Sequence, residues 1–291
     1  MPKMLVLRRG GLGDTLLMLP VLAALRRQCA GAELHFAGVL EFAELLPAFG
    51  AVDRACSTEA LQLWALARRP AAAAVVARFG SYQHIVADDP AVAVLAAADR
   101  QVQVFDPRRV RPGSPFGAQL LEQLGLGDAA ADARLAARAA PMPGAPVVLA
   151  PGSGAPAKCW PRAHWLLLAA MLAATGHRLA VVIGPAERER DDPSRWGWPD
   201  GTGLWAGLGV VELAQRLRPA LAFAGNDSGV THLAAALSVP TVALFGPTDP
   251  AVWAPAGEHV QCLREVAAGR PAADPGAVCR ALLALAESGR G

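Results

Sequence analysis

The chain has 291 residues, more than one compact α/β core usually holds, so its length predicts two domains. Apolar residues make up 53% of it and charged residues 18%, which is typical of globular proteins and excludes an intrinsically disordered chain. The formal net charge of +2 argues against a protein that binds nucleic acid by attraction to phosphates, so we expect no nucleic-acid partner.

The five cysteines are scattered, odd in number and without the CxxC or Cys/His spacing of a metal site. We therefore expect reduced thiols in a cytosolic protein and no structural zinc. The N-terminal apolar segment is too short for a signal peptide, and the longest later apolar run, 165–174, is too short to span a bilayer. These features predict a soluble, cytoplasmic protein.

In the first half of the chain, apolar segments that end in turn residues predict strands over 4–7, 33–39, 84–87 and 102–105. Helices are predicted between and after them, over 16–25, 61–77 and 119–126. Pro20 either kinks the first of these helices or lies near its true start, and Pro70 interrupts the second. Strands that alternate with helices imply parallel pairing.

Three prolines and a glycine within 141–146 predict a linker, which divides the chain into an N-terminal domain, 1–146, and a C-terminal domain, 147–291. The alternating pattern then restarts. Strands are predicted over 147–150, 179–183, 222–224 and 241–245, and helices over 164–174, 211–217, 230–237 and 275–287. Two doubly wound α/β halves account most simply for this order, and ligands bind at the carboxyl ends of the strands in such sheets.

The stretch 222–250 has the order strand, tight turn, helix, strand, tight turn. Asn226, Asp227 and Ser228 are residue types that cap helices, because their side-chain oxygens accept N–H groups of a first turn. A strand that leads through such a turn into a helix aims N–H groups and the positive end of the helix dipole at one point, which attracts phosphate. His232 lies one helical turn further on, where we favour a ligand contact over a packed core histidine.

A second candidate is the turn Gly-Gly-Leu-Gly-Asp at 10–14. It is not a dinucleotide-binding motif, because Leu16 occupies the third glycine position, and this disfavours a nicotinamide dehydrogenase. Two interpretations of Asp14 stay open. It is either a helix N-cap or a carboxylate that takes a proton from a substrate hydroxyl.

Two further candidates follow predicted strands of the second half. Lys158 is one of only two lysines in an arginine-rich chain and follows Ser153 on the same loop, which favours a flexible charge for phosphate over a solvated side chain. Glu187 comes just after the strand end at 184–185. It belongs to the first turn of a charged helix, or it accepts hydrogen bonds from ribose hydroxyls.

Four segments, 9–20, 158–164, 184–187 and 225–250, resemble in order the heptosyltransferases of glycosyltransferase family 9. These enzymes transfer heptose from ADP-heptose to the inner core of lipopolysaccharide. The resemblance implies the GT-B architecture, two Rossmann-like domains facing a central cleft, with the acceptor on the first domain and the nucleotide sugar on the second. It leaves open whether the last helix packs back on the first domain.

The resemblance also implies a role for each candidate residue. Asp14 matches the proposed general base, Lys158 the residue that neutralises the diphosphate, and Glu187 the ribose contact. The remaining donor-site positions are Gly13, Ser153, Asp227, Ser228, Gly229 and His232. An inverting transfer without a cofactor is implied, and the sequence has no Asp-x-Asp motif, so we expect no metal requirement.

The departures from the family lie on the acceptor side, where 88–116 is compressed and 113–116 replaces an expected histidine and glutamate. The acceptor and the donor sugar therefore stay open, and a nucleotide-sugar-binding protein that has lost transfer is the alternative function, against which the retention of Asp14 argues. A lipid-linked glycan acceptor would bring the protein to the inner face of the membrane. Local positive charge would come from Arg8, Arg9, Arg26, Arg27, Arg68, Arg69, Arg108, Arg109 and Arg111.

Overall fold

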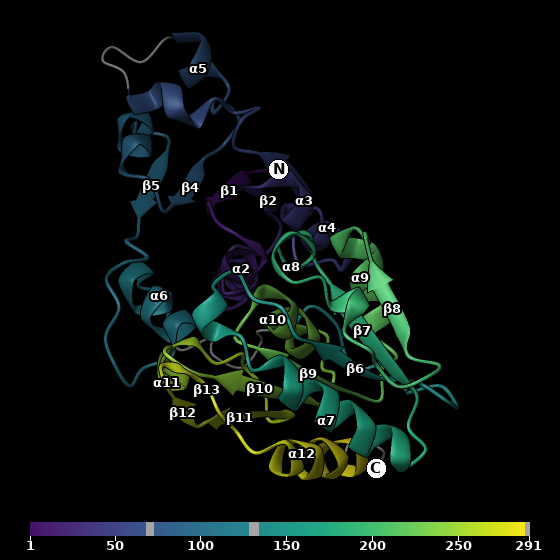
Figure 1. Cartoon of the computed structure of the whole chain (residues 1–291). Helices are drawn as coiled ribbons and strands as arrows, with labels where there is room; N and C mark the ends of the chain where they lie inside the picture. The colour runs from purple at the N-terminus through teal and green to yellow at the C-terminus, as the bar shows by residue number, and fades with distance from the viewer. Residues whose placement is uncertain (68–72, 128–133, 289–291) are drawn as a thin grey trace. The chain divides into compact units, whose positions relative to one another are not determined.

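The computed structural model describes residues 1–67, 73–127 and 134–288, and the chain forms two compact units, Met1–Leu135 and Ala136–Gly291 (Figure 1). The division lies ahead of the predicted linker, so 141–146 belongs to the second unit. Each unit is built around one parallel sheet. No helix in the described ranges is long and apolar enough to cross a membrane.

The first unit contains a five-stranded parallel sheet in the order β3-β2-β1-β4-β5. Its strands are β1 (Lys3–Leu7), β2 (Glu33–Gly38), β3 (Arg54–Ser57), β4 (His84–Ala87) and β5 (Gln101–Val104). Its helices and 3₁₀ turns are α1 (Leu12–Leu16), α2 (Leu19–Gln28), α3 (Leu40–Ala43), α4 (Leu45–Ala48), η1 (Leu63–Ala67), α5 (Ala73–Ala77), η2 (Pro90–Leu95) and α6 (Phe116–Leu124). The strand order reverses between β1 and β4, which is where ligands bind in sheets of this kind.

The second unit repeats this topology in a six-stranded parallel sheet of order β11-β10-β9-β6-β7-β8, which reverses between β6 and β9. Its strands are β6 (Val147–Ala150), β7 (Leu179–Ile183), β8 (Gly203–Ala206), β9 (Ala222–Asn226), β10 (Thr241–Phe245) and β11 (Val260–Arg264), beside the short antiparallel pair β12 (Val266–Ala267) and β13 (Arg270–Pro271). Its helices and 3₁₀ turns are η3 (Pro156–Lys158), α7 (Arg162–Ala174), α8 (Pro185–Arg190), η4 (Pro193–Arg195), α9 (Val210–Leu217), α10 (Gly229–Ala236), α11 (Pro250–Trp253) and α12 (Pro275–Ser288).

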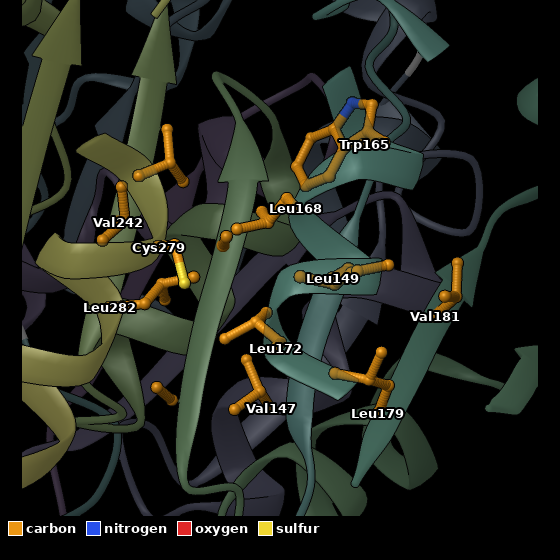
Figure 2. Packing of buried hydrophobic residues seen from close by; sticks show 14 of the residues in the cluster. Val147, Leu149, Trp165, Leu168, Leu172, Leu179, Val181, Val242, Cys279 and Leu282 are labelled. Carbon is orange, nitrogen blue, oxygen red and sulfur yellow. The ribbon is translucent and has the colours of Figure 1, made fainter. Parts of the chain in front are cut away.

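The central strands of the second sheet, β6 and β9, are buried along their whole length and mostly apolar because both of their faces are covered. Side chains of a strand alternate between the two faces, and on β6 Val147 and Leu149 point to the same core as Trp165 of α7 and Leu282 of α12 (Figure 2). Helices α7 and α12 lie side by side over this face. The last helix therefore belongs to the core of the second unit.

The predicted elements with continuous apolar runs are present, with ends shifted by a few residues. Pro20 is in the first turn of α2, so it marks a helix start rather than a kink. Helix α6 ends at Leu124, two residues before the predicted end, because Gly125 takes the left-handed conformation that closes it. The predicted helix over 61–77 is instead η1 and α5, and Pro70 lies outside the described residues. The edge strands β3, β8 and β11 were not predicted, because half-exposed strands lack an apolar run.

A buried polar pair gives the first unit a pH dependence that can be tested. Nδ1 of His35, on β2, lies 2.9 Å from the hydroxyl of Tyr82, and both residues are buried. Burial raises the pKa of Tyr82 from 10.0 to about 12. Between these values the unfolded chain loses the phenolic proton and the folded chain keeps it, so stability falls as the pH rises.

We predict that the melting temperature of the wild type falls more steeply between pH 10 and pH 12 than that of Tyr82→Phe, which has no phenol to ionise. Thermal melts followed by circular dichroism at several pH values measure the two slopes. Only the slopes are compared, because the substitution also removes the contact with His35. Parallel declines in the two proteins would contradict the prediction.

Candidate functional site

The two central strands of the second sheet are tied together at their carboxyl ends by Asn226, the last residue of β9. This residue is 0% exposed. Its Nδ2 donates to the carbonyl of Pro151 at 2.7 Å, and its Oδ1 accepts the backbone N–H of Trp160 at 3.0 Å. Since Pro151 and Trp160 belong to the loop that follows β6, one side chain fixes this loop against β9 where the strand order reverses.

The predicted phosphate residues meet at the same place. Nζ of Lys158 lies 2.8 Å from Oδ2 of Asp227, and the hydroxyl of Thr248 donates to that oxygen at 2.6 Å. The hydroxyl of Ser153 donates to the backbone carbonyl of Asp227 at 2.9 Å. The side chain of Asp227 is 7% exposed and that of Lys158 is 29% exposed, so the ammonium, with three N–H donors, is held from one side and reachable from another.

The start of α10 differs from the prediction in one respect. Ser228 is the N-cap residue, but among the residues that the structure describes no side chain caps the helix. Asn226 and Asp227 are engaged elsewhere, and the hydroxyl of Ser228 lies 3.2 Å from that of Thr231. The predicted side-chain caps are therefore wrong, and first-turn N–H groups from Gly229 onward are left for an anion.

Glu187 lies in the first turn of α8, as the first interpretation of it required, and also borders a pocket. A Cβ atom at Gly152 or at Gly184 would collide with the Glu187 carboxyl group, so the carboxylate occupies the space that these two glycines leave. The pocket has a volume of about 200 Å³ and is lined in part by Gly152, Ser153 and Glu187 with the ring of Trp196. His232 is buried in α10, 8% exposed.

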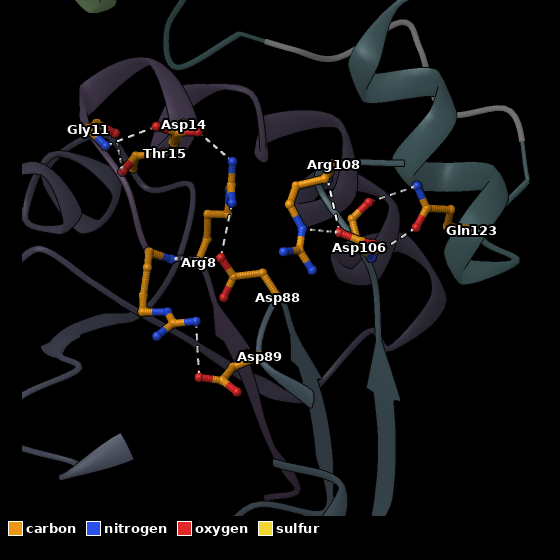
Figure 3. A network of polar contacts seen from close by, with 10 residues as sticks. Arg8, Gly11, Asp14, Thr15, Asp88, Asp89, Asp106, Arg108 and Gln123 are labelled. Carbon is orange, nitrogen blue, oxygen red and sulfur yellow. Dashed lines mark hydrogen bonds and ion pairs between the residues drawn. The ribbon is translucent and has the colours of Figure 1, made fainter. Parts of the chain in front are cut away.

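A second polar cluster lies at the carboxyl ends of β1 and β4 in the first unit, where the order of that sheet reverses (Figure 3). Arg8 follows β1, Asp88 follows β4, and Asp14 is in α1 directly after Gly13. Nη1 of Arg8 donates to Oδ2 of Asp88 at 3.0 Å, and Nη2 donates to Oδ1 of Asp14. The guanidinium thus joins the two carboxylates.

Asp14 is tied to its own helix as well. Gly11 is the N-cap residue of α1, and its N–H donates to Oδ2 of Asp14 at 3.0 Å. Asp14 is therefore the third residue of the helix and not its N-cap, although it does satisfy a helix-start N–H as the structural interpretation expected. Its side chain remains 39% exposed, whereas those of Arg8 and Asp88 are 9% and 5% exposed.

The structure thus brings Ser153, Lys158 and Asp227 together and places Gly13 and Asp14 in the other unit. The partners Thr248, Arg8 and Asp88 were not predicted from the sequence, and Asn226 was predicted to be a helix cap. Arg8 and Asp88 do follow directly after buried strands, which was the available signal. In the described part of the chain, no group of three or more acidic, histidine or cysteine side chains is arranged to hold a metal ion.

The model of glycosyltransferase family 9 (heptosyltransferase) matches residues 74–277, more than half of the chain. The match is made on the sequence alone, independently of the geometry described above. The matched range includes every candidate residue from Ser153 to His232. The chain therefore belongs to glycosyltransferase family 9.

Curated relatives match over shorter stretches. Lipopolysaccharide heptosyltransferase 1 of Pseudomonas aeruginosa is 40% identical over 110 residues, which are 37% of this chain and 31% of the relative. Lipooligosaccharide heptosyltransferase 2 of Haemophilus influenzae is 30% identical over 114 residues, 38% of this chain and 33% of the relative. The matched stretches thus span about a third of the curated relatives' length.

Solved structures resemble the whole chain. A family 9 glycosyl transferase from Veillonella parvula superposes with a TM-score of 0.77 at 16% identity and covers 99% of this chain and 98% of its own. The E. coli heptosyltransferase WaaC with ADP superposes with a TM-score of 0.69 at 19% identity, covering 97% and 99%. These likenesses confirm the predicted fold class, GT-B with two Rossmann-like units.

Because Asn226 satisfies both a buried carbonyl and a buried N–H, we predict that Asn226→Ala lowers the free energy of unfolding of the second unit by about 1–3 kcal/mol. Urea denaturation followed by tryptophan fluorescence measures this, since six of the seven tryptophans lie in that unit. Gln261→Ala, which removes an exposed amide on β11, serves as the control. Equal effects of the two substitutions would show that the Asn226 bridge contributes little.

Proposed function

We propose that the protein is an inverting, metal-independent glycosyltransferase that moves a heptose or a similar sugar from an ADP-sugar to a lipopolysaccharide core or a related glycan. The observation that carries this proposal is the cluster of Ser153, Lys158 and Asp227 at the carboxyl ends of β6 and β9. Nucleotides bind at this reversal point in doubly wound sheets. The likeness in fold to E. coli heptosyltransferase WaaC with ADP supports the choice of nucleotide.

The donor site would work by meeting charge that develops on the departing diphosphate. Lys158 supplies a cation that Asp227 holds in place, and the N–H groups of Ser228 and Gly229 with the dipole of α10 supply fixed partial charge. Glu187 would accept hydrogen bonds from the ribose hydroxyls beside the pocket, and the first-turn residue His232 would contact the donor. Together these groups stabilise the leaving group without a cofactor or a metal.

The acceptor reaction would begin at Asp14. One of its carboxylate oxygens takes the proton of an acceptor hydroxyl while the hydroxyl oxygen attacks the anomeric carbon of the donor sugar. The bond from this carbon to the diphosphate oxygen breaks on the opposite face, so the anomeric configuration inverts. Gly13 and the glycine turn before it keep bulk away from the carboxylate.

The proposed contact with the inner face of the membrane would be weak. The arginines that form ion pairs with carboxylates include Arg8, Arg9, Arg26, Arg108 and Arg111. Arg68 and Arg69 lie outside the described residues. Because so much of this charge is balanced locally, attraction to anionic lipid would be small and would fade with salt.

One observation favours the alternative, a nucleotide-sugar-binding protein without transfer activity. Both carboxylate oxygens of Asp14 accept hydrogen bonds from within the protein, from Arg8 and from Gly11. A purely structural residue would show the same contacts. The two experiments that follow separate donor binding from proton abstraction and so distinguish the two functions.

The first experiment concerns Lys158. ADP at ~100-fold excess over its dissociation constant should stabilise the wild type by about 2–3 kcal/mol through mass action. Lys158→Ala should lose most of this ADP-induced shift in melting temperature, because the diphosphate loses its cation. Lys3→Ala, which removes the only other lysine, should keep the shift. A shift with NAD and none with ADP would refute the assignment of the donor.

The second experiment concerns Asp14. Asp14→Asn keeps the size of the side chain but cannot take a proton, so we predict a normal ADP shift, a melting temperature within a few degrees of wild type and a loss of transfer of ~100-fold or more. Asp106→Asn, another aspartate of the first unit that is paired with an arginine, is the control. Unfolding of Asp14→Asn would assign Asp14 a structural role, and full activity would place the base elsewhere.

A further inference from the structure

Arg8 is held more firmly than the other arginine next to it. Its backbone N–H donates to the carbonyl of Ala37 at 3.0 Å, which continues the pairing of β1 with β2, and its side chain is only 9% exposed. Arg9 pairs with Asp89 at 3.0 Å, but its side chain is 57% exposed. The two arginines therefore have the same chemistry in different surroundings.

The guanidinium of Arg8 is shared between two carboxylates instead of forming a two-pronged pair with one. Its two Nη atoms bind Asp88 and Asp14, while its Nε and Oδ1 of Asp88 are buried without a hydrogen-bond partner in the described ranges. A two-pronged pair of Arg8 and Asp88 would instead give these atoms hydrogen-bond partners. In the structure the Arg8 guanidinium instead binds Asp88 through one Nη atom and Asp14 through the other.

The anchor of the arrangement is Asp88, which is 5% exposed. Its Oδ2 accepts Nη1 of Arg8 at 3.0 Å and the backbone N–H of Arg9 at 3.1 Å. The chain of contacts runs from this buried carboxylate through Arg8 to Asp14, the most exposed of the three (Figure 3). Asp14 is thus fixed at both oxygens, by Arg8 and by Gly11, while its side chain remains accessible.

We propose that Arg8 is a positioning residue for Asp14 and that Asp88 holds Arg8 in place. This inference rests on the proposed function, in which Asp14 takes the proton of the acceptor hydroxyl. A base that is aligned before the acceptor arrives gains rate because the reacting atoms need little further reorientation, and a misplacement of about 1 Å can cost 100-fold. Arg8 itself does not touch a substrate in this account.

The test measures kcat and the acceptor KM from ADP release, with ADP-heptose as the donor and heptose-deficient lipopolysaccharide as the acceptor. Arg8→Gln should lower kcat by about 10–100-fold with little change in KM. Arg8→Lys should recover part of the rate, since an ammonium can reach one carboxylate but cannot bridge two as a guanidinium does. Arg9→Gln, the matched control, should stay close to the wild type.

The decisive comparison is made in the Asp14→Asn background. If Arg8 acts through Asp14, adding Arg8→Gln to Asp14→Asn should lower kcat no further. A further loss of the same size as in the wild type would overturn the inference, because it would mean that Arg8 supports the fold or the donor site. Wild-type activity of Asp14→Asn is a different result, which would refute the base in the proposed function.

A further variant guards against loss of folding, because Arg8→Gln leaves Asp88 buried without its cation. The double substitution Arg8→Gln with Asp88→Asn replaces both charges by amides of similar size and should melt near the wild type. We expect it to remain slow in transfer, with an ADP-induced shift equal to that of the wild type. Wild-type kcat in this folded variant would overturn the inference.

Discussion

The second unit depends on one buried amide at the point where its strand order reverses. A parallel sheet brings the loops after β6 and β9 to the same edge, but adjacency alone does not hold them in register. Asn226 does this by bonding to Pro151 and Trp160 of the first loop from the end of the second strand. With the loops fixed, Lys158 meets Asp227, the residue before the N-cap Ser228 of α10, and no described side chain caps that helix.

The two units share one sheet topology, but the side chains at their reversal points carry opposite charge. At the reversal point of the second sheet, one lysine is held by one buried aspartate, and helix-start N–H groups add positive potential. At the reversal point of the first sheet, one buried arginine is shared by two aspartates, which leaves an excess of negative charge. The lysine site of the second sheet suits an anionic ligand, and the arginine site of the first sheet suits a carboxylate that accepts a proton. The difference in charge between the two sites follows from the residues that come directly after the central strands of each sheet.

That the candidate residues follow strands could be predicted from the sequence, but their hydrogen-bond partners could not. Ser153, Lys158 and Asp227 follow strands with apolar runs on both faces, so their meeting at one sheet edge was predictable from topology. The bonds of Asn226 and Arg8 were not, because Asn226 and Pro151 are 75 positions apart and Arg8 and Asp88 are 80 apart. Asparagine commonly caps helices, but Asn226 instead bonds the end of β9 to the loop after β6. Short, half-exposed edge strands were missed for a different reason, namely the lack of a periodic apolar pattern.

The most direct test of the account follows donor and acceptor together in one reaction without free divalent metal. Purified protein is incubated in EDTA with ADP-heptose and heptose-deficient lipopolysaccharide, and released ADP and the mass of the glycolipid are measured. We predict that ADP is released only when the acceptor is present and that the amount released equals the heptose gained by the glycolipid. Tight binding of ADP-heptose with no ADP released and no added mass would contradict it and would identify a nucleotide-sugar-binding protein.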